Sequence, residues 1–123
     1  MGLTYARVAF SRNRRGPGKA VRLLVDTGAD YSVLMKGELS RLGVVPEFEE
    51  DIEIGNGQVI SRPVGRTYVR WKNRIAETFV AFGEAHDARV LGAYALEGLR
   101  LEVDPKSHRV RPRRRSLFVR LGG

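Results

Sequence analysis

The chain has 123 residues and a formal net charge of +8, from 22 Lys and Arg against 14 Asp and Glu. Hydrophobic residues make up 42% and charged residues 29%, which is ordinary for a folded protein and excludes a disordered or fibrous chain. This length suits one domain with one modest core and excludes most large catalytic architectures.

Strand and turn signals alternate through the first half of the chain. Short apolar or alternating runs are separated by a cluster of turn-forming residues at 11–18, which indicates an exposed hairpin loop between two strands. Apolar residues spaced three apart before Gly43 are typical of a short helix that ends at a glycine. These signals predict strands over 6–10, 20–25 and 31–35 and a short helix over 36–42.

The second half has two hairpin signals, followed by a second helix. Gly55-Asn56-Gly57 lies at the centre of the first hairpin, and Lys72-Asn73 forms the turn of the second. A brief apolar run, Val90-Leu91, leads into Gly92. The sequence therefore predicts hairpins over 51–60 and 67–82, a helix over 93–99 and a strand over 100–103.

All of the excess positive charge lies near the two ends. Residues 1–25 carry six basic and no acidic side chains, and residues 106–123 carry seven and none. Such clusters bind phosphates or simply keep a surface solvated. Residues 111–123 are interpreted as a basic C-terminal tail, in which the apolar residues 117–119 are a candidate strand for a dimer.

The cellular setting follows from what the sequence lacks. Without cysteine there is no disulfide, thiol nucleophile or thiolate metal site, which fits a reducing compartment. No apolar run approaches the roughly 20 residues that span a bilayer, and the N-terminus lacks the apolar segment of a secretory signal. We therefore expect a cytoplasmic protein with no membrane partner.

The most informative segment is the one that contains Asp26-Thr27-Gly28. Its carboxylate comes directly after an apolar strand and is followed by a hydroxyl residue and a glycine, where backbone amides can approach it. The whole stretch from Leu23 to Leu34 resembles the active-site segment of retropepsins, the single-domain aspartic proteases typified by retroviral proteases. Ile54 to Gln58 lies where that family has its flap, and Val90-Leu91-Gly92 before a helix resembles its hydrophobic-hydrophobic-Gly motif.

The resemblance covers about residues 4–110 and implies a fold and an activity. It implies one retropepsin-like domain over 1–123: an all-β closed barrel with one or two short helices. It also implies an aspartic endopeptidase that cleaves an extended polypeptide with no cofactor and no metal. Acid–base hydrolysis needs one group to accept a proton and another to donate one. The sequence has no second Asp-Ser/Thr-Gly, so we expect a homodimer in which two copies each supply Asp26.

The resemblance assigns roles to individual residues. The implied catalytic residues are Asp26, Thr27 and Gly28; the implied substrate-binding residues are Leu24, Ala29, Asp30, Val33, Gly55, Asn56, Gly57, Gln58, Ala88 and Val90; and the implied structural motif is Leu91 and Gly92. For the apolar members of this set, plain core packing is an equally good interpretation.

One departure from the family pattern concerns the support of the active-site loop. Viral members follow the glycine of the second motif with an arginine that braces the loop through the position of Asp30, whereas this chain has Ala93. The candidates for that bracing role are Arg7 and Arg89.

Other kinds of site fit the sequence less well, except one. A calcium loop that starts at Asp26 would need a bidentate acid at the position of Gly37, and His86 and His108 do not form a zinc-binding pair. The serious alternative is a retropepsin-like module of weak or no activity. Such a module would bind nucleic acid or another acidic partner through its Arg-rich ends.

Overall fold

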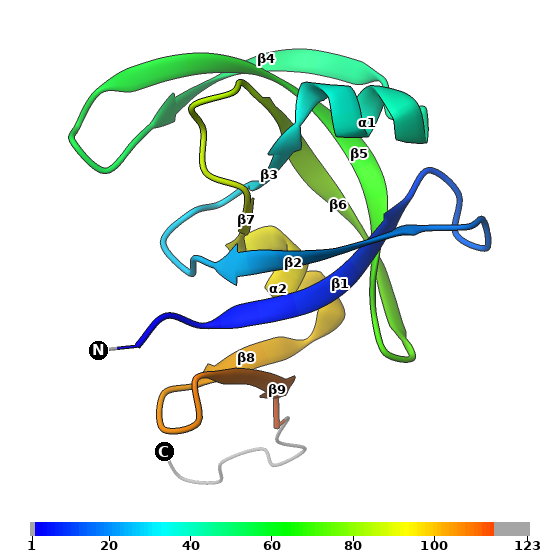
Figure 1. Ribbon diagram of the computed structural model, residues 1–123, viewed down its shortest axis with the longest axis vertical. Helices are drawn as coiled ribbons and strands as arrows, with labels where there is room; N and C mark the ends of the chain where they lie inside the picture. Colours follow the sequence, from blue (N-terminus) through cyan, green and yellow to red (C-terminus); the bar gives the residue numbers. More distant parts are fainter. Residues whose placement is uncertain (1, 115–123) are drawn as a thin grey trace, which may run out of the picture.

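A computed structural model describes residues 2–114 and contains nine strands and two short helices in that range (Figure 1). The mainly β composition and the two helices confirm the coarse fold expected from the sequence. The elements are β1 (Tyr5–Ser11), β2 (Lys19–Val25), β3 (Ser32–Met35), α1 (Lys36–Leu42), β4 (Pro46–Glu53), β5 (Val59–Trp71), β6 (Arg74–Gly83), β7 (Val90–Leu91), α2 (Ala93–Leu99), β8 (Leu101–Asp104) and β9 (Arg109–Pro112).

Seven of these strands form one sheet, in the order β1-β2-β7-β3-β6-β5-β4, and β8 pairs with β9 in a separate sheet. The long strand β5 pairs with β4 near its start and with β6 and β1 toward its end. Because β1 pairs with both β2 and β5, the path of paired strands returns to its first strand.

Two features of the strands differ from the sequence-based expectation. The two predicted hairpins share the single strand β5, which continues through Pro63. That proline lies opposite Glu49 of β4 and just before Val64, the first residue of β5 paired with β6, so it interrupts no ladder between β5 and β6. Strand β9 was not predicted, while the candidate dimer strand at 117–119 lies outside the described residues.

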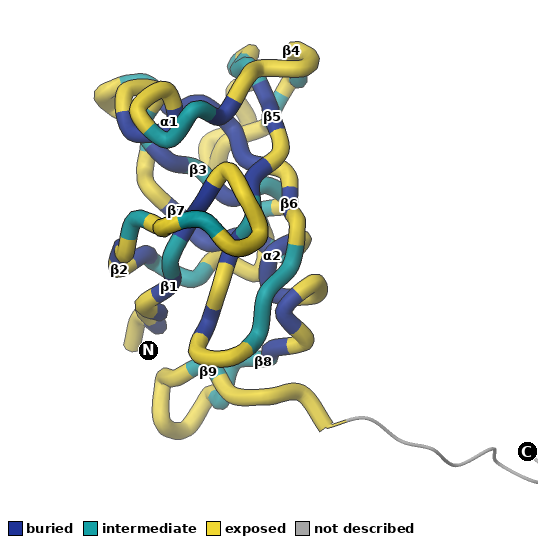
Figure 2. The backbone as a smooth tube through the Cα atoms, turned by 90° about the vertical axis from the view of Figure 1, so that its right-hand side faces the viewer, coloured by how far each residue is buried: buried dark blue, intermediate teal, exposed yellow. Residues whose placement is uncertain are grey.

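The hydrophobic core lies between the strands and α2. Alternate residues of β1 and β2 point inward, as the burial pattern of a half-buried strand requires. In Figure 2 the buried segments cluster along the strands and α2, whereas the hairpin tips are exposed. The buried cluster consists of Ala6, Val8, Phe10, Val21, Leu23, Leu34, Leu39, Val44, Val69, Trp71, Val80, Phe82, Leu91, Ala95, Leu96, Leu99 and Leu101.

Helix α1 begins directly after β3 and ends at Gly43, as predicted. Gly43 has φ 81°, the left-handed conformation that favours glycine, and its N–H donates to the carbonyl of Ser40. Within this helix Glu38 is buried, although it carries a carboxylate. Burying a charge is costly unless it is paired and hydrogen-bonded.

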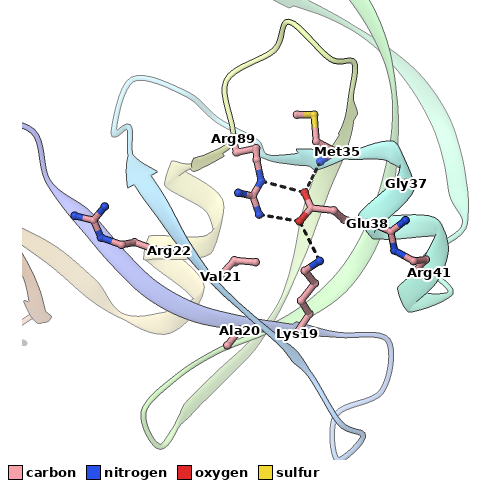
Figure 3. A pocket seen from close by; sticks show the side chains of 9 residues that line it. All are labelled: Lys19, Ala20, Val21, Arg22, Met35, Gly37, Glu38, Arg41 and Arg89. Carbon is pink, nitrogen blue, oxygen red and sulfur yellow. Dashed lines mark hydrogen bonds and ion pairs between the residues drawn. The ribbon is translucent and has the colours of Figure 1, made fainter.

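The Glu38 carboxylate has its partners on three different segments (Figure 3). It accepts hydrogen bonds from the backbone N–H of Met35 at 3.0 Å and from Arg89 Nε and Nη2 at 3.0 and 2.7 Å, and Lys19 Nζ lies 3.4 Å away. Burial alone raises the pKa of Glu38, but these hydrogen bonds and positive charges outweigh it and hold the pKa below its usual value. The ionised carboxylate thus ties α1 to β2 and to the loop before β7.

We predict that Glu38→Gln lowers the free energy of unfolding by about 1–3 kcal/mol at pH 7, because the hydrogen bonds to charge are lost. The pKa of Glu38 is lower in the folded state than in the unfolded state, so its stabilisation is present above the unfolded pKa and disappears as the pH falls through the folded value. Urea denaturation at pH 7 and at about pH 3 should show the difference from wild type shrinking. Glu53→Gln, at an exposed residue of β4, is the control; equal effects of both substitutions would contradict the role given to Glu38.

Candidate active site

Asp26 is the first residue after β2, and its backbone is held by β7. Val25 is paired with Leu91, and the Asp26 N–H donates to the Leu91 carbonyl at 3.0 Å. The turn is closed by the Ala29 N–H, which donates to the Asp26 carbonyl at 3.2 Å. The end of the buried strand thereby determines where the carboxylate lies.

The Asp26 side chain is exposed but oriented by its own loop. Its Oδ1 accepts the backbone N–H of Gly28 at 3.0 Å. Asp26, Thr27 and Gly28 are all exposed in the isolated chain, and Ala29 behind them is half-buried. The backbone of Asp26 is held in place by hydrogen bonds, and its carboxylate is exposed. A molecule approaching from the solvent can therefore reach the carboxylate.

The loop after Asp26 rests on the start of α2. The N–H groups of Ala93 and Tyr94, which have no partner within the helix, donate to the carbonyls of Ala29 and Asp30 at 2.7 and 3.1 Å. The N–H of Gly92 donates to the Ser32 hydroxyl at 3.0 Å, in a fully buried position. Strand β7 and α2 therefore hold the backbone of the candidate catalytic loop in place through hydrogen bonds.

Gly92 is required here by the close approach of two backbones. A Cβ atom at this position would lie 2.5 Å from the Tyr31 carbonyl oxygen and 2.9 Å from that of Ala29. Real Cβ atoms do not come so close to backbone oxygens, so any side chain would push the loop away. The glycine of the second motif thus packs directly against the segment that follows Asp26-Thr27-Gly28.

Three of the candidate substrate-binding residues lie on adjoining strands. Val90 of β7 is opposite Leu24 of β2 on one side and opposite Val33 of β3 on the other. Leu24 and Val33 are half-buried, Val90 is buried, and Ala88, in the loop before β7, is exposed. The structure brings the first three together beside the Asp26 loop, and either a pocket wall or core packing accounts for their positions.

The predicted flap forms the tip of the hairpin between β4 and β5. Gly57 has φ 82°, and its N–H donates to the Ile54 carbonyl at 2.8 Å, while Asn56 Oδ1 accepts the N–H of Gln58 at 2.8 Å. The four residues from Gly55 to Gln58 are exposed, and a Cβ atom added at Gly55 or Gly57 would meet nothing within 4 Å. In Figure 1 this tip and the loop between β2 and β3 extend toward the same side of the molecule.

Neither candidate brace, Arg7 nor Arg89, forms an ion pair with Asp30 among residues 2–114. Arg89, one candidate, is bound to Glu38 instead, because the buried carboxylate offers two oxygens in a geometry that a guanidinium matches. Arg7, the other candidate, lies on the exposed side of β1, and no ion pair joins it to Asp30 within residues 2–114. The loop is held instead by the backbone hydrogen bonds to α2.

Tyr31 is a residue of this region that sequence reasoning missed. Its hydroxyl donates to Glu50 Oε2 of β4 at 2.6 Å, and burial together with this bond raises the pKa of Tyr31 to about 12. Its ring makes edge contacts with Tyr94 and Phe79 at centroid distances of 5.5 and 6.3 Å. Tyr31 thereby connects β4, the first strand of the flap hairpin, to the segment after Asp30. The signal available in the sequence was an aromatic residue directly after Asp30.

Among residues 2–114 no group of three or more His, Asp or Glu side chains is arranged to hold a metal ion. None of the helices in this range is long and apolar enough to cross a membrane. Asp26, Thr27 and Gly28 line neither of the two open hollows of this chain, and all three are exposed in the isolated chain.

Comparisons with known proteins show the fold. No protein-family model and no curated protein matches the chain. Among solved structures it is similar to the EIAV protease complexed with the inhibitor HBY-793, with a TM-score of 0.55 and 24% sequence identity; the match covers 80% of this chain and 88% of that one. The chain thus has the fold of a retroviral protease, and similarity at this level of identity shows the fold alone.

We predict that Gly92→Ala lowers the free energy of unfolding by about 1–3 kcal/mol, because its methyl group collides with backbone that is itself hydrogen-bonded. Gly55→Ala, at the open hairpin tip, is the matched control and should stay within about 0.5 kcal/mol of wild type. Chemical denaturation measures both. Equal midpoints for wild type and Gly92→Ala would show that the two backbones are not in close contact.

Proposed function

We propose that this protein is an aspartic endopeptidase that works as a homodimer, with one Asp26 from each copy at the site. The observation that carries the proposal is the placement of Asp26: an exposed carboxylate on a supported loop at the end of β2, in a chain with the fold of a retroviral protease. Among the described residues there is no second acid in an equivalent position on the same chain.

The chemistry requires the two carboxyl groups to share one proton. Two carboxyl groups at hydrogen-bonding distance cannot both ionise easily, so one is protonated while the other is charged. The charged group accepts a proton from water, which attacks the peptide carbonyl, and the protonated group donates to the substrate.

The neighbouring residues have proposed roles in this dimer. Thr27 would interlock with its counterpart near the axis, and Gly28 would let the substrate backbone pass close to Asp26. Ala29 and Asp30 would line the groove for an extended polypeptide, with Leu24, Val33, Ala88 and Val90 as apolar walls. Gly55 to Gln58 would close over the bound peptide and exclude water, which strengthens electrostatic interactions inside the site.

Several structural features support the dimer and the barrel. A two-stranded sheet is marginal alone, and β8 and β9 pair only with each other in the described part of the chain, so a second copy could extend them. The N-terminal segment reaches the same place, since a Cβ atom at Gly2 would lie 3.0 Å from the His108 ring.

The return of the strand path from β5 to β1 supports the predicted closed barrel.

We predict that Asp26→Asn lowers the rate of peptide hydrolysis on the order of 10²–10⁴-fold, because the acid–base group is lost. The measurement uses a fluorogenic peptide library, with solution mass and thermal unfolding recorded for each variant. Asp51→Asn, an exposed acid on β4, is the control and should keep wild-type activity.

The same assay across a dilution series tests the dimer. Specific activity should fall as the solution mass drops from two copies to one, because half a site lacks the second carboxyl group. Full activity of a monomeric solution, or wild-type activity of Asp26→Asn, would refute the proposed mechanism.

A further inference from the structure

An open groove of about 560 Å³ runs along β1, and Asp26 is not among the residues that line it. We call it the β1 groove. Cationic side chains from four segments line it: Arg7 of β1, Arg70 of β5, Lys72 of the β5–β6 turn and Arg109 of β9. Figure 1 shows β1 lying between β2 and the far end of β5, with β9 below it.

The strand register explains why a groove forms there. Ala9 of β1 lies between Ala20 of β2 and Arg70 of β5 in one row across the sheet. In the next row on the same face, Arg7 lies directly opposite Arg22. The side chains of Ala9 and Ala20 are short, so the sheet surface is low at this point, and the longer arginine side chains project next to it.

The cations of this groove lack acidic partners among residues 2–114. Arg7, Arg70, Lys72 and Arg109 take part in none of the ion pairs of the described chain, and the groove lining contains no Asp or Glu. Arg7 and Arg22 also repel each other, because like charges directly opposite on paired strands destabilise a sheet. An anionic ligand would remove that repulsion.

The acidic side chains lie elsewhere. Five of the fourteen acids are on β4, namely Glu47, Glu49, Glu50, Asp51 and Glu53. The ion pairs that do form engage other cations, such as Arg66 with Glu47 and Lys36 with Glu84. The fold therefore separates charge between the acidic strand β4 and a basic face along β1.

The basic face extends beyond the β1 groove, which suits a polymer better than a single anion. A second hollow, of about 650 Å³, adjoins it through Ala20 and contains Arg22 and Arg41 as well as the Glu38 cluster (Figure 3). The two hollows together place positive charge along both sides of β2. A chain of phosphates can contact such a stripe at several points, and each contact releases counterions.

We propose that the β1 groove binds single-stranded nucleic acid through its phosphates. Arginines predominate among the cations, and their planar guanidinium groups match phosphate oxygens. At one end of the groove the Tyr5 ring is 39% exposed and has the Arg22 guanidinium 4.0 Å from its centroid, a planar pair on which a base can stack. A membrane surface fits less well, because the apolar residues here are recessed, with Trp71 only 9% exposed.

The test is fluorescence anisotropy of a labelled oligouridine 12-mer with the full chain, measured between about 50 and 200 mM salt. Contact with four phosphates gives a slope of about −3 for log K against log salt, at about 0.7 per phosphate. Arg7→Gln with Arg70→Gln should weaken binding by about tenfold or more at the lower salt and make the slope shallower by about 1.4. Both side chains are exposed, and thermal unfolding checks that the variant is folded.

The matched control is Lys36→Gln with Arg66→Gln, which removes the same charge from two exposed, ion-paired cations. It should bind like wild type, and so should Asp26→Asn, because Asp26 does not line the β1 groove. Loss of proteolysis with intact binding would therefore leave this proposal standing.

Two outcomes would overturn it. One is equal affinity and slope for the groove variant and wild type, which would place any binding on other basic residues, such as those at 111–115. The other is binding to phosphatidylserine vesicles with none to the oligonucleotide at the lower salt, which would make the basic face a membrane-binding surface.

Discussion

The candidate site depends on one backbone contact, the packing of Gly92 against the segment from Ala29 to Tyr31. Strand β7 is only two residues long, yet it lies between β2 and β3 and pairs with both. This packing is possible only if the residue that follows β7 has no side chain. The first N–H groups of α2 then reach the loop carbonyls, and Asp26 is held at the end of its strand. The supporting elements are rigid secondary structure, and the functional groups are carried on the loop between them.

The parts of the fold encoded by neighbouring residues were predictable from the sequence. Gly43 ends α1 in the left-handed conformation, Gly57 takes a positive φ at the hairpin tip, and the apolar runs form the expected strands. The Asp26 motif and Val90-Leu91-Gly92 were recognisable as separate segments. Their contact appears only in the structure, where Gly92 packs against the segment after the motif and the Asp26 N–H donates to the Leu91 carbonyl.

The parts that depend on distant partners were not predictable. Arg89 binds Glu38, 51 residues away, and no local pattern distinguishes that partner from Asp30. The continuity of β5 through Pro63 depends on where pairing with β6 begins, and β9 depends on its pairing with β8. Tyr31 donates a hydrogen bond to Glu50, 19 residues away on β4, and no local pattern in the sequence predicts that contact.

The two proposals use opposite features of the same molecule. Proteolysis requires an exposed acid to be brought next to its twin, whereas nucleic-acid binding requires cations left without acidic partners. Since Asp26 does not line the groove, a nucleic acid bound there would hold the protein in place without covering Asp26. The binding proposal stands independently of the catalytic one.

The central claim is that the site is completed by a second copy. The most direct measurement adds increasing amounts of inactive Asp26→Asn protein to a fixed amount of wild type and follows hydrolysis after exchange of subunits. Mixed dimers have a single Asp26, so the account predicts that activity falls steeply as the inactive protein comes into excess. Activity that stays constant, while mass measurement shows that mixed dimers have formed, would contradict it.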